Sequence, residues 1–367
     1  MKKIKEIQNY LNQTFMERED IIESLFVSVI ARQHMLLIGP PGTAKSALIM
    51  EFTKQLTGIS YFQWLLTRFS TPEELFGPVS LQELEKGVYK RNTANKLPEA
   101  NIAFLDEVFK SNSAILNALL TLINERLFYN NGAPVQSPLI SVIGGSNEYP
   151  EEDGLEALFD RFLLRFELNY IQDDTNFMAM LQGDHLYVQP PQPLTSDEIV
   201  QMQDMSDMVT VPQEVLKTLI RIRKELQDEG IRPSDRRYRQ SLSLIKAKAA
   251  LDGRSSAVLK DLDILKHALW ETEDQISKTA EIIEAYTVDT CQKELERILL
   301  IAKETYMTVQ NDGSTEVGME ATTKLKACLN ELVVLENQYP ERSEEIQKMK
   351  KRVIEAQEAI GQVLLGL

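Results

Sequence analysis

Short apolar runs divide the first half of the chain at regular intervals. Helix-like stretches separate five such runs: HMLLIG (34–39), SYFQWLL (60–66), NIAFLDE (101–107), LISVIGG (139–145) and RFLLRFEL (161–168). Continuous apolar runs of this length are typical of strands that are buried on both faces of a parallel sheet. The pattern therefore predicts an α/β domain over residues 1–182, with five parallel strands and helices on both faces of the sheet.

Local signals between the strands predict one short helix and two hairpins. In TPEELFG, Thr71 is placed to cap a helix, Pro72 lies in the first turn and Glu74 completes a capping box. Segment 78–97 is polar, with a glycine between strand-like pieces, and LFYNNGAPVQ (127–136) contains an Asn-Gly turn. We expect two hairpins there that project from the sheet.

The second half of the chain has helical patterns. A Pro-rich stretch, YVQPPQPLTSDE (187–198), is interpreted as a linker. Helices are expected near 211–229, 234–251 and 259–270, the second capped by Ser234. They would form a small all-α domain within residues 183–270. The remaining residues, 271–367, place apolar side chains at helical spacing and predict about three more helices, with breaks at QNDGS and QYPERS.

Composition limits the classes of function. The chain of 367 residues has a net charge of −15, which repels phosphate backbones and favours protein partners over nucleic acid. Only Cys291 and Cys328 are present, so neither a disulfide framework nor a zinc site is indicated. No apolar run is long enough to span a membrane, and the N-terminus lacks a secretory signal. We expect a cytoplasmic protein without membrane insertion.

The sequence GPPGTAKS (39–46) is close to the phosphate-binding pattern G-x-x-x-x-G-K-[ST]. It follows a predicted strand and precedes a predicted helix, and backbone amides at such a helix N-terminus can hold phosphates. Lys45 is placed to reach the β- and γ-phosphates of ATP, and Ser46 to bind Mg²⁺. The residues predicted to contact the nucleotide are Gly39, Pro40, Pro41, Gly42, Thr43, Ala44, Lys45, Ser46 and Ala47.

Ala44 stands where the pattern has its second glycine. If this residue already belongs to the helix, alanine is favoured over glycine by roughly 1 kcal/mol. A left-handed backbone would instead penalise alanine by about 1–2 kcal/mol. We expect the first case, with Gly42 serving the turn. Alternatively, GPPGTAKS is only a strand-to-helix turn rich in Pro and Gly.

Polar side chains follow two more predicted strands. Asp106 ends NIAFLDE at the edge where ligands bind in open α/β sheets, so it is expected to hold Mg²⁺ through water. Glu107 would orient and deprotonate the attacking water. Asn147, in GGSNEYP, could bond this water or the γ-phosphate. Taken singly, such an acidic pair is often only solvated, and an Asn beside Pro is usually part of a turn.

Together these motifs carry a family resemblance. GPPGTAKS, FLDE, GGSNEYP, DRFLLRFEL and SDRR, in this order, resemble AAA+ ATPases of the MoxR group. The stretches at 67–91 and 98–126 are most similar to the RavA (regulatory ATPase variant A) branch, which also has Ala before the lysine. The resemblance covers about residues 15–270. It implies an AAA+ P-loop sheet, an all-α lid and a helical C-terminal extension.

The resemblance also implies roles for single residues. Asn147 matches sensor 1, and Arg161 matches the arginine finger that is presented to the ATP of a neighbouring subunit. Arg165 is the alternative finger, although a structural role within its strand explains it more simply. Arg236 matches sensor 2, and Arg237 is the alternative. Two arginines at a helix start oppose the helix dipole, which an anionic ligand nearby would explain, although they can also be merely solvated.

At the level of assembly, the resemblance implies a ring, expected to be a hexamer. Segments 78–92 and 127–138 would correspond to hairpins that line its central pore. MoxR-like ATPases usually act with a partner that carries a von Willebrand factor A domain, so such a partner is implied. The function would be ATP-driven remodelling or assembly of an unknown protein target, or metal insertion into it.

Two observations restrict this interpretation. RavA-like proteins carry a β-rich, partner-binding insertion in their C-terminal helices, and residues 271–367 have no strand-like block of that kind. The extension would therefore pack within its own subunit, or else bind a neighbouring subunit or a different protein. Two other functions stay open, namely a nucleic-acid-stimulated motor of restriction or helicase type, and a slow nucleotide-gated scaffold.

Overall fold

The structure is a computed structural model, and it describes residues 2–150, 154–183, 189–288, 290–311 and 315–365. The chain divides into two compact units, Met1–Ala285 and Tyr286–Leu367.

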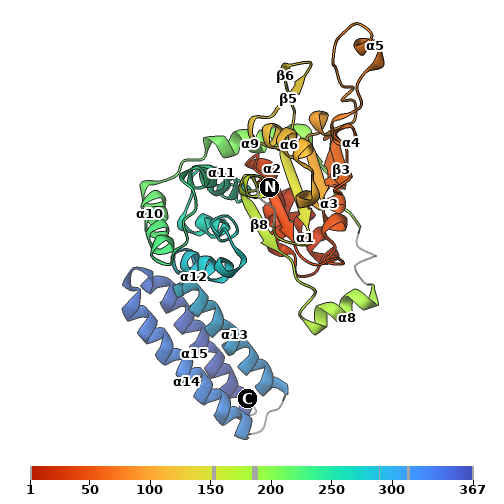
Figure 1. The fold of residues 1–367 in the computed structure, drawn as a ribbon. Coiled ribbons are helices and arrows are strands. Elements are labelled where there is room, and N and C mark those ends of the chain that lie inside the picture. The colour runs from red at the N-terminus through yellow and green to blue at the C-terminus, as the bar shows by residue number, and fades with distance from the viewer. Residues whose placement is uncertain (1, 151–153, 184–188, 289, 312–314, 366–367) are drawn as a thin grey trace. The chain divides into compact units, whose positions relative to one another are not determined.

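A five-stranded parallel sheet forms the centre of the first unit (Figure 1). Its order is β3-β4-β7-β1-β8. The strands are β1 (Met35–Ile38), β3 (Tyr61–Leu65), β4 (Ile102–Asp106), β7 (Ser141–Ser146) and β8 (Leu164–Glu167). Every residue of β1 and β7 is buried, as expected for strands that have neighbours on both sides and helices on both faces. The five predicted strands and the α/β class are confirmed.

Helices cover both faces of this sheet. Leu36 and Ile38 point from β1 to one face, where they join a core with α6 (Ser113–Glu125) and α7 (Leu155–Arg161). Three helices near the N-terminus belong to the first unit as well: α1 (Lys2–Thr14), α2 (Glu19–Ile30) and α3 (Lys45–Lys54). The ring centroids of Phe26 on α2 and Phe52 on α3 are 5.1 Å apart. Alternation of side chains along a strand thus supplies two apolar layers.

Two segments project from the sheet (Figure 1). The predicted hairpin at 127–136 is confirmed as β5 (Leu127–Asn130) and β6 (Ala133–Gln136), and both residues of its Asn-Gly turn have a positive φ. The second predicted hairpin is wrong. Segment 78–92 holds the short helix α5 (Leu81–Leu84), and only one antiparallel bridge, Val79 with Arg91, closes its base. Leu81 and Leu84 are exposed, so this segment has no apolar face on which a strand ladder could pack.

Short elements fix the sheet's connections. The capping box before α4 (Pro72–Phe76) is present as predicted, with Thr71 and Glu74 bonded reciprocally. Two 3-10 turns flank β4, namely η1 (Leu97–Glu99) and η2 (Val108–Lys110). Beyond β8, α8 (Asp174–Gln182) has no buried residue.

The predicted linker is partly structured. β9 (Leu194–Thr195) pairs with β2 (Leu56–Thr57), and α9 (Ser196–Met208) follows directly. A capping box between Thr195 and Glu198 starts α9, a signal present in TSDE that the linker interpretation overlooked. The linker interpretation is therefore wrong from residue 194 onward, and residues 184–188 lie outside the described part.

The small helical domain follows. α10 (Gln213–Asp228) and α11 (Asp235–Leu251) are confirmed, and Ser234 accepts a hydrogen bond from Arg237 N as the N-cap. The third predicted helix is a 3-10 helix, η4 (Leu259–His267). Its buried Asp261 binds Arg254 and Val258 N, which draws the first turn inward. η5 (Glu273–Gln275) and α12 (Ile276–Thr287) come next.

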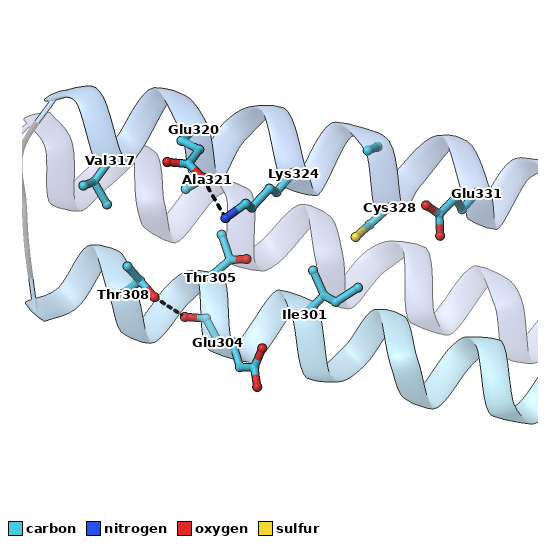
Figure 2. A pocket seen from close by; sticks show the side chains of 11 residues that line it. Ile301, Glu304, Thr305, Thr308, Val317, Glu320, Ala321, Lys324, Cys328 and Glu331 are labelled. Carbon is cyan, nitrogen blue, oxygen red and sulfur yellow. Dashed lines mark hydrogen bonds and ion pairs between the residues drawn. The ribbon is translucent and has the colours of Figure 1, made fainter.

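Three long helices make up most of the second unit: α13 (Thr290–Asn311), α14 (Thr315–Gln338) and α15 (Ser343–Leu365), with η6 (Pro340–Arg342) before the last. The predicted break at QYPERS separates α14 from α15, whereas the predicted break at QNDGS falls mostly on residues 312–314, which lie outside the described part. Their apolar stripes meet in a core that includes Leu295, Val309, Leu332 and Val353. A cavity of about 560 Å³ lies between α13 and α14 (Figure 2).

Candidate active site

The loop GPPGTAKS runs from the end of β1 into α3 and folds around the side chain of Lys45. Lys45 is 7% exposed, and its Nζ donates to Gly39 O at 2.6 Å, Pro40 O at 3.1 Å and Asn147 Oδ1 at 2.9 Å. Burial lowers the pKa of the Lys45 ammonium, while the charges of Asp106 and Glu107 oppose this shift. A buried cation bonded to loop carbonyls is thus available at the helix N-terminus.

Ala44 corrects the sequence interpretation. It has φ 64° and ψ 22°, a left-handed conformation, and serves as the N-cap of α3. The expectation that Ala44 already belongs to the helix is wrong, because the chain turns into the helix one residue later. The substitution therefore carries the left-handed penalty of about 1–2 kcal/mol. Gly39 is required for a different reason, since a Cβ there would lie 2.3 Å from Leu168 O.

Ser46 and Asp106 meet below the loop. Ser46 Oγ donates to Asp106 Oδ2 at 3.0 Å, which joins the start of α3 to the end of β4. Asp106 Oδ1 accepts from Glu107 N at 3.1 Å. A Cβ on Gly145 of β7 would lie 2.7 Å from Asp106 Oδ1, so glycine leaves room for this carboxylate. A hydroxyl and a carboxylate oxygen side by side are ligand types that Mg²⁺ accepts in phosphate sites.

Glu107 lies at the same edge of the sheet. It has φ 52° and ψ 46°, it is 9% exposed, and its Oε1 accepts a hydrogen bond from Asn147 Nδ2. A left-handed conformation at a residue other than glycine is costly and is found preferentially at functional sites. The structure thus brings together five predicted site residues from three parts of the sequence: Lys45, Ser46, Asp106, Glu107 and Asn147.

Sequence reasoning missed a residue beside this group. Lys110 Nζ lies 3.1 Å from Glu107 Oε2. A basic residue three positions after the acidic pair was the available signal, because three residues make one turn of a 3-10 helix.

An apolar cavity next to the loop was also missed. It has a volume of about 560 Å³ and includes Gly42 and Ala44 in its wall, together with Phe15, Met16, Tyr170, Ile171, Phe177 and Met180. Tyr170 Oη donates to Pro41 O at 3.2 Å. No local pattern predicts this cavity, because its walls come from the N-terminal segment, the loop and the chain after β8. Its size and apolar character suit a flat ring such as a nucleobase.

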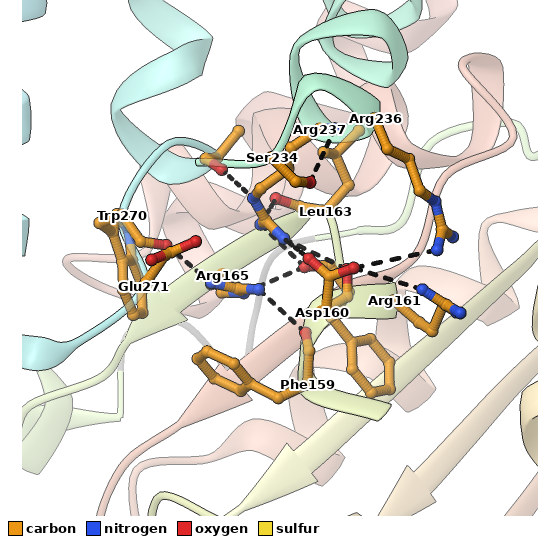
Figure 3. A network of polar contacts seen from close by, with 12 residues as sticks. Phe159, Asp160, Arg161, Leu163, Arg165, Ser234, Arg236, Arg237, Trp270 and Glu271 are labelled. Atoms are coloured by element: carbon orange, nitrogen blue, oxygen red, sulfur yellow. Dashed lines mark hydrogen bonds and ion pairs between the residues drawn. The ribbon is translucent and has the colours of Figure 1, made fainter. Parts of the chain in front are cut away.

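The predicted arginines form a separate network around Asp160 (Figure 3). Asp160 Oδ2 lies 3.3 Å from Arg161 Nη1 and 3.9 Å from Arg236 Nη1, and Asp160 Oδ1 lies 3.4 Å from Arg237 Nη1. Arg236 Nη2 also donates to Asn124 Oδ1 at 3.0 Å. In the described part of the chain, none of the polar contacts of Arg161 or Arg236 reaches Lys45 or Glu107.

The two alternative arginines are buried and bonded within the subunit. Arg165 donates to the carbonyls of Phe159, Phe162 and Trp270, and its guanidinium lies 3.8 Å from the Phe159 ring centroid. Arg237 donates to four backbone carbonyls, those of Asp160, Phe162, Leu163 and Ala268. Burial lowers the pKa of Arg237 to about 10. The hydrogen bonds of both side chains connect the helical domain to the C-terminal end of α7.

Arg161 and Arg236 are more exposed than these two arginines. Their side chains are 22% and 40% exposed, whereas that of Arg237 is 1% exposed. Arg161 Nε is buried and has no hydrogen-bond partner among the described residues. Three guanidinium groups share one carboxylate here, so the cluster has a positive excess that suits an anion.

The comparisons with known proteins identify the family of the chain. Residues 2–209 match a family described as the MoxR domain in the MoxR-vWA-beta-propeller ternary systems, and residues 214–283 match the AAA lid domain. The chain therefore belongs to the MoxR family of AAA+ proteins. Its similarity to the RavA branch stays a prediction.

Three similar proteins extend this result. An uncharacterized protein of Methanocaldococcus jannaschii is 40% identical over 300 residues, which are 82% of this chain and 77% of that one. Chaperone MoxR1 of Mycobacterium tuberculosis is 22% identical over 71% of this chain and 74% of its own. A crystal structure of a candidate ATPase from Cytophaga hutchinsonii has a TM-score of 0.62 at 18% identity, covering 78% and 93% of the two chains, and it supports the fold.

Within the described residues, no helix combines the length and the apolar character that crossing a bilayer requires.

Proposed function

We propose that this protein is a MoxR-type AAA+ ATPase that hydrolyses Mg-ATP to remodel a protein target. One observation carries the proposal. The hydroxyl of Ser46 donates a hydrogen bond to the Asp106 carboxylate. At the same edge of the sheet, the side chain of Asn147 is hydrogen-bonded to both Lys45 and Glu107. These are the parts that phosphoryl transfer needs, namely a cation for the phosphates, oxygen ligands for a metal ion and a carboxylate for water.

The residues present fit ATP and Mg²⁺. Lys45 would exchange its bonds to Gly39 O and Pro40 O for phosphate oxygens, which are stronger acceptors. Ser46 and Asp106 would hold Mg²⁺, and the cavity beside Ala44 would take the base. The bound metal ion supplies neutralisation of phosphate charge. Glu107 would accept a proton from the attacking water, while Asn147 fixes the orientation of Glu107 Oε1.

Hydrolysis would depend on a second copy of the chain. The polar contacts of Arg161 and Arg236 are with Asp160 and Asn124 rather than with Lys45, and this supports a role at a neighbour's ATP. Arg161 would act as the arginine finger, worth about 10³–10⁵ in rate. Arg236 would act as sensor 2, since the guanidinium of Arg237 is hydrogen-bonded to backbone carbonyls of its own subunit. A closed ring, expected to be a hexamer, satisfies every site in this way.

A von Willebrand factor A domain protein is the proposed partner in the cytoplasm. The matched family is described from ternary systems that contain such a domain and a β-propeller. The target would be a protein that is remodelled, assembled or loaded with a metal ion. A binding measurement with the von Willebrand factor A protein encoded nearest to this one tests the partner, and absence of binding in both nucleotide states would count against it.

ATP hydrolysis by the wild type beside Glu107→Gln tests the reaction. We expect the variant to bind ATP and to lose at least about 100-fold in rate. Equal rates would remove Glu107 from the mechanism and favour a nucleotide-gated scaffold. Strong stimulation by DNA or RNA would favour a nucleic-acid motor, which the net charge of −15 disfavours.

A further inference from the structure

The turn after β4 places Lys110 against Glu107. η2 covers Val108–Lys110, and Lys110 N donates to Glu107 O at 2.9 Å. Glu107 is the left-handed N-cap of this turn, and one 3-10 turn of three residues brings the chain back beside it. Val108 and Phe109 lie between Glu107 and Lys110 in the sequence. They are 0% and 7% exposed, so they anchor the turn in the core. The backbone therefore directs the Lys110 stem toward the carboxylate.

The contact between these side chains is an ion pair that leaves room for another partner. Lys110 Nζ lies 3.1 Å from Glu107 Oε2. Among the described residues, Oε2 is buried without a hydrogen-bond partner, because the ammonium does not approach along a hydrogen-bond direction. Asn147 occupies the other oxygen, Oε1. The positive charge thus offsets the carboxylate while a lone pair of Oε2 stays available.

A buried carboxylate at this position needs such a cation. Glu107 follows Asp106 directly, and two neighbouring carboxylates repel each other more strongly where water is excluded. Lys45 compensates on one side, but its ammonium contacts Asn147 and the loop carbonyls rather than Glu107. Lys110 is the cation that contacts Glu107 itself.

Spacing alone does not distinguish this pair. Lys54 and Glu51 on α3 are also three residues apart, with 2.9 Å between Nζ and Oε2. The two lysines are both exposed, Lys54 to 60% and Lys110 to 40%, and ion pairs at exposed positions contribute little to stability by themselves. The pairs differ at the carboxylate, because Glu107 has a left-handed backbone and a side chain that is 12% exposed, whereas Glu51 lies within α3 and its side chain is 19% exposed. Lys54 is therefore a matched control.

We infer that Lys110 is a positioning residue for Glu107. It holds the carboxylate between its own ammonium and the amide of Asn147, so that Oε2 faces the attacking water with its negative charge compensated. This inference rests on the proposed function, because it assigns Lys110 a role only if Glu107 activates water.

Steady-state ATP hydrolysis by the full chain tests the inference. Lys110→Ala should lower kcat by about 10–100-fold, since a displacement of about 1 Å can cost about 100-fold. KM for ATP should change less than about twofold, because Lys110 does not line the phosphate loop. Lys110→Arg should recover most of the rate, whereas the neutral Lys110→Gln should not. Lys54→Ala should match the wild type.

A second measurement separates positioning from folding. Lys110 also lines a cavity of about 230 Å³ together with Arg68, Ser111 and Tyr149. Propylammonium, which replaces the atoms lost in Lys110→Ala, should enter there and restore part of the rate. Thermal unfolding and binding of a fluorescent ATP analogue should be close to wild type.

The outcomes are distinct. If the wild type hydrolyses ATP and Lys110→Ala, or Lys110→Gln, matches its kcat, the inference is overturned while the proposed function stands. A loss that neither Lys110→Arg nor propylammonium reverses also overturns it. If the wild type and Glu107→Gln have equal rates, the proposed function itself has failed.

Discussion

Lys45, the first residue of α3, donates a hydrogen bond at 2.9 Å to Oδ1 of Asn147, which directly follows β7. The same amide group donates through Nδ2 to Glu107. A residue expected to bind phosphate is therefore linked to a residue expected to activate water through one side chain. Any ligand that draws Lys45 toward itself must break or reorient this bond.

Asn147→Ala should separate binding from hydrolysis. The variant loses the link between Lys45 and Glu107, but it keeps the loop and the Ser46 contact to Asp106. We expect ATP affinity within about threefold of wild type and a rate lower by about 100-fold, a typical loss for one oriented hydrogen bond in a transition state. Equilibrium binding and steady-state rates measure the two effects. Weaker binding with an unchanged rate would contradict the assignment.

Ala44→Gly should stabilise the protein. Glycine removes the left-handed penalty of about 1–2 kcal/mol. The greater entropy of glycine in the unfolded chain offsets about 0.4–1 kcal/mol of this gain in stability. Ala47, which is exposed and helical, provides the opposite control. Ala47→Gly should destabilise by about 1 kcal/mol. Chemical unfolding of both variants checks the signs, and two changes of the same sign would mean that the backbone at residue 44 differs.

Action of Arg161 on a second copy predicts complementation. Arg161→Ala subunits keep their own loop, and Lys45→Ala subunits keep their own finger. Mixing two inactive preparations should place an intact finger beside an intact loop and restore part of the ATPase rate. No recovery at any ratio, in mixtures shown to co-assemble, would argue against action in trans.

Acid should destabilise the first unit through His267. Burial, helped by the charge of Lys266, lowers the pKa of His267 from 6.5 to about 3. The unfolded chain binds this proton below about pH 6.5 and the folded chain does not, so the free energy of unfolding should fall as pH drops from about 6.5 toward 3. The contribution is roughly 1.4 kcal/mol per pH unit.

His267→Gln isolates that contribution. His34 is buried as well, and its pKa is lowered well below 6.5, so part of the dependence should persist. Urea unfolding at several pH values between 4 and 7 should give a shallower slope for the variant. Identical slopes would show that His267 does not take up the proton on unfolding.

Leu325→Ala should destabilise the second unit. Leu325 is 0% exposed in the core of the three long helices, and truncation of such a residue costs about 2–5 kcal/mol. Val333→Ala, at a position that is 50% exposed, should change stability by less than about 0.5 kcal/mol. Hydrogen exchange of amides in α13–α15 of the full chain distinguishes the two variants.

Sequence reasoning was most accurate where the determinant is local. The five strands follow from apolar runs, and the caps at Thr71 and Ser234 follow from side chains that bond their own helix. It failed where polar segments have no face to bury. Segment 78–92 gave no apolar alternation to fix a ladder, and TSDE was assigned to a linker because neighbouring prolines dominated its interpretation.

The arginines illustrate a second limit. Arg236 and Arg237 are adjacent in sequence, and either could serve as sensor 2. Helical geometry turns neighbouring side chains by about 100°, so one became buried against backbone carbonyls and the other stayed half exposed. Nothing in the sequence of SDRR decides which arginine becomes buried, because the carbonyls belong to residues 160, 162, 163 and 268.

The sequence by itself determined the family, the five strands of the sheet and the residues predicted to hold phosphate and metal, since short motifs encode strand ends and helix starts. Tertiary structure decided the rest. It set the left-handed backbone at Ala44, the ion pair of Lys110 with Glu107, and the grouping of Arg161 with Arg236 around Asp160. The physical reason is that backbone conformation at a turn and the burial of a charge depend on packing between segments distant in sequence.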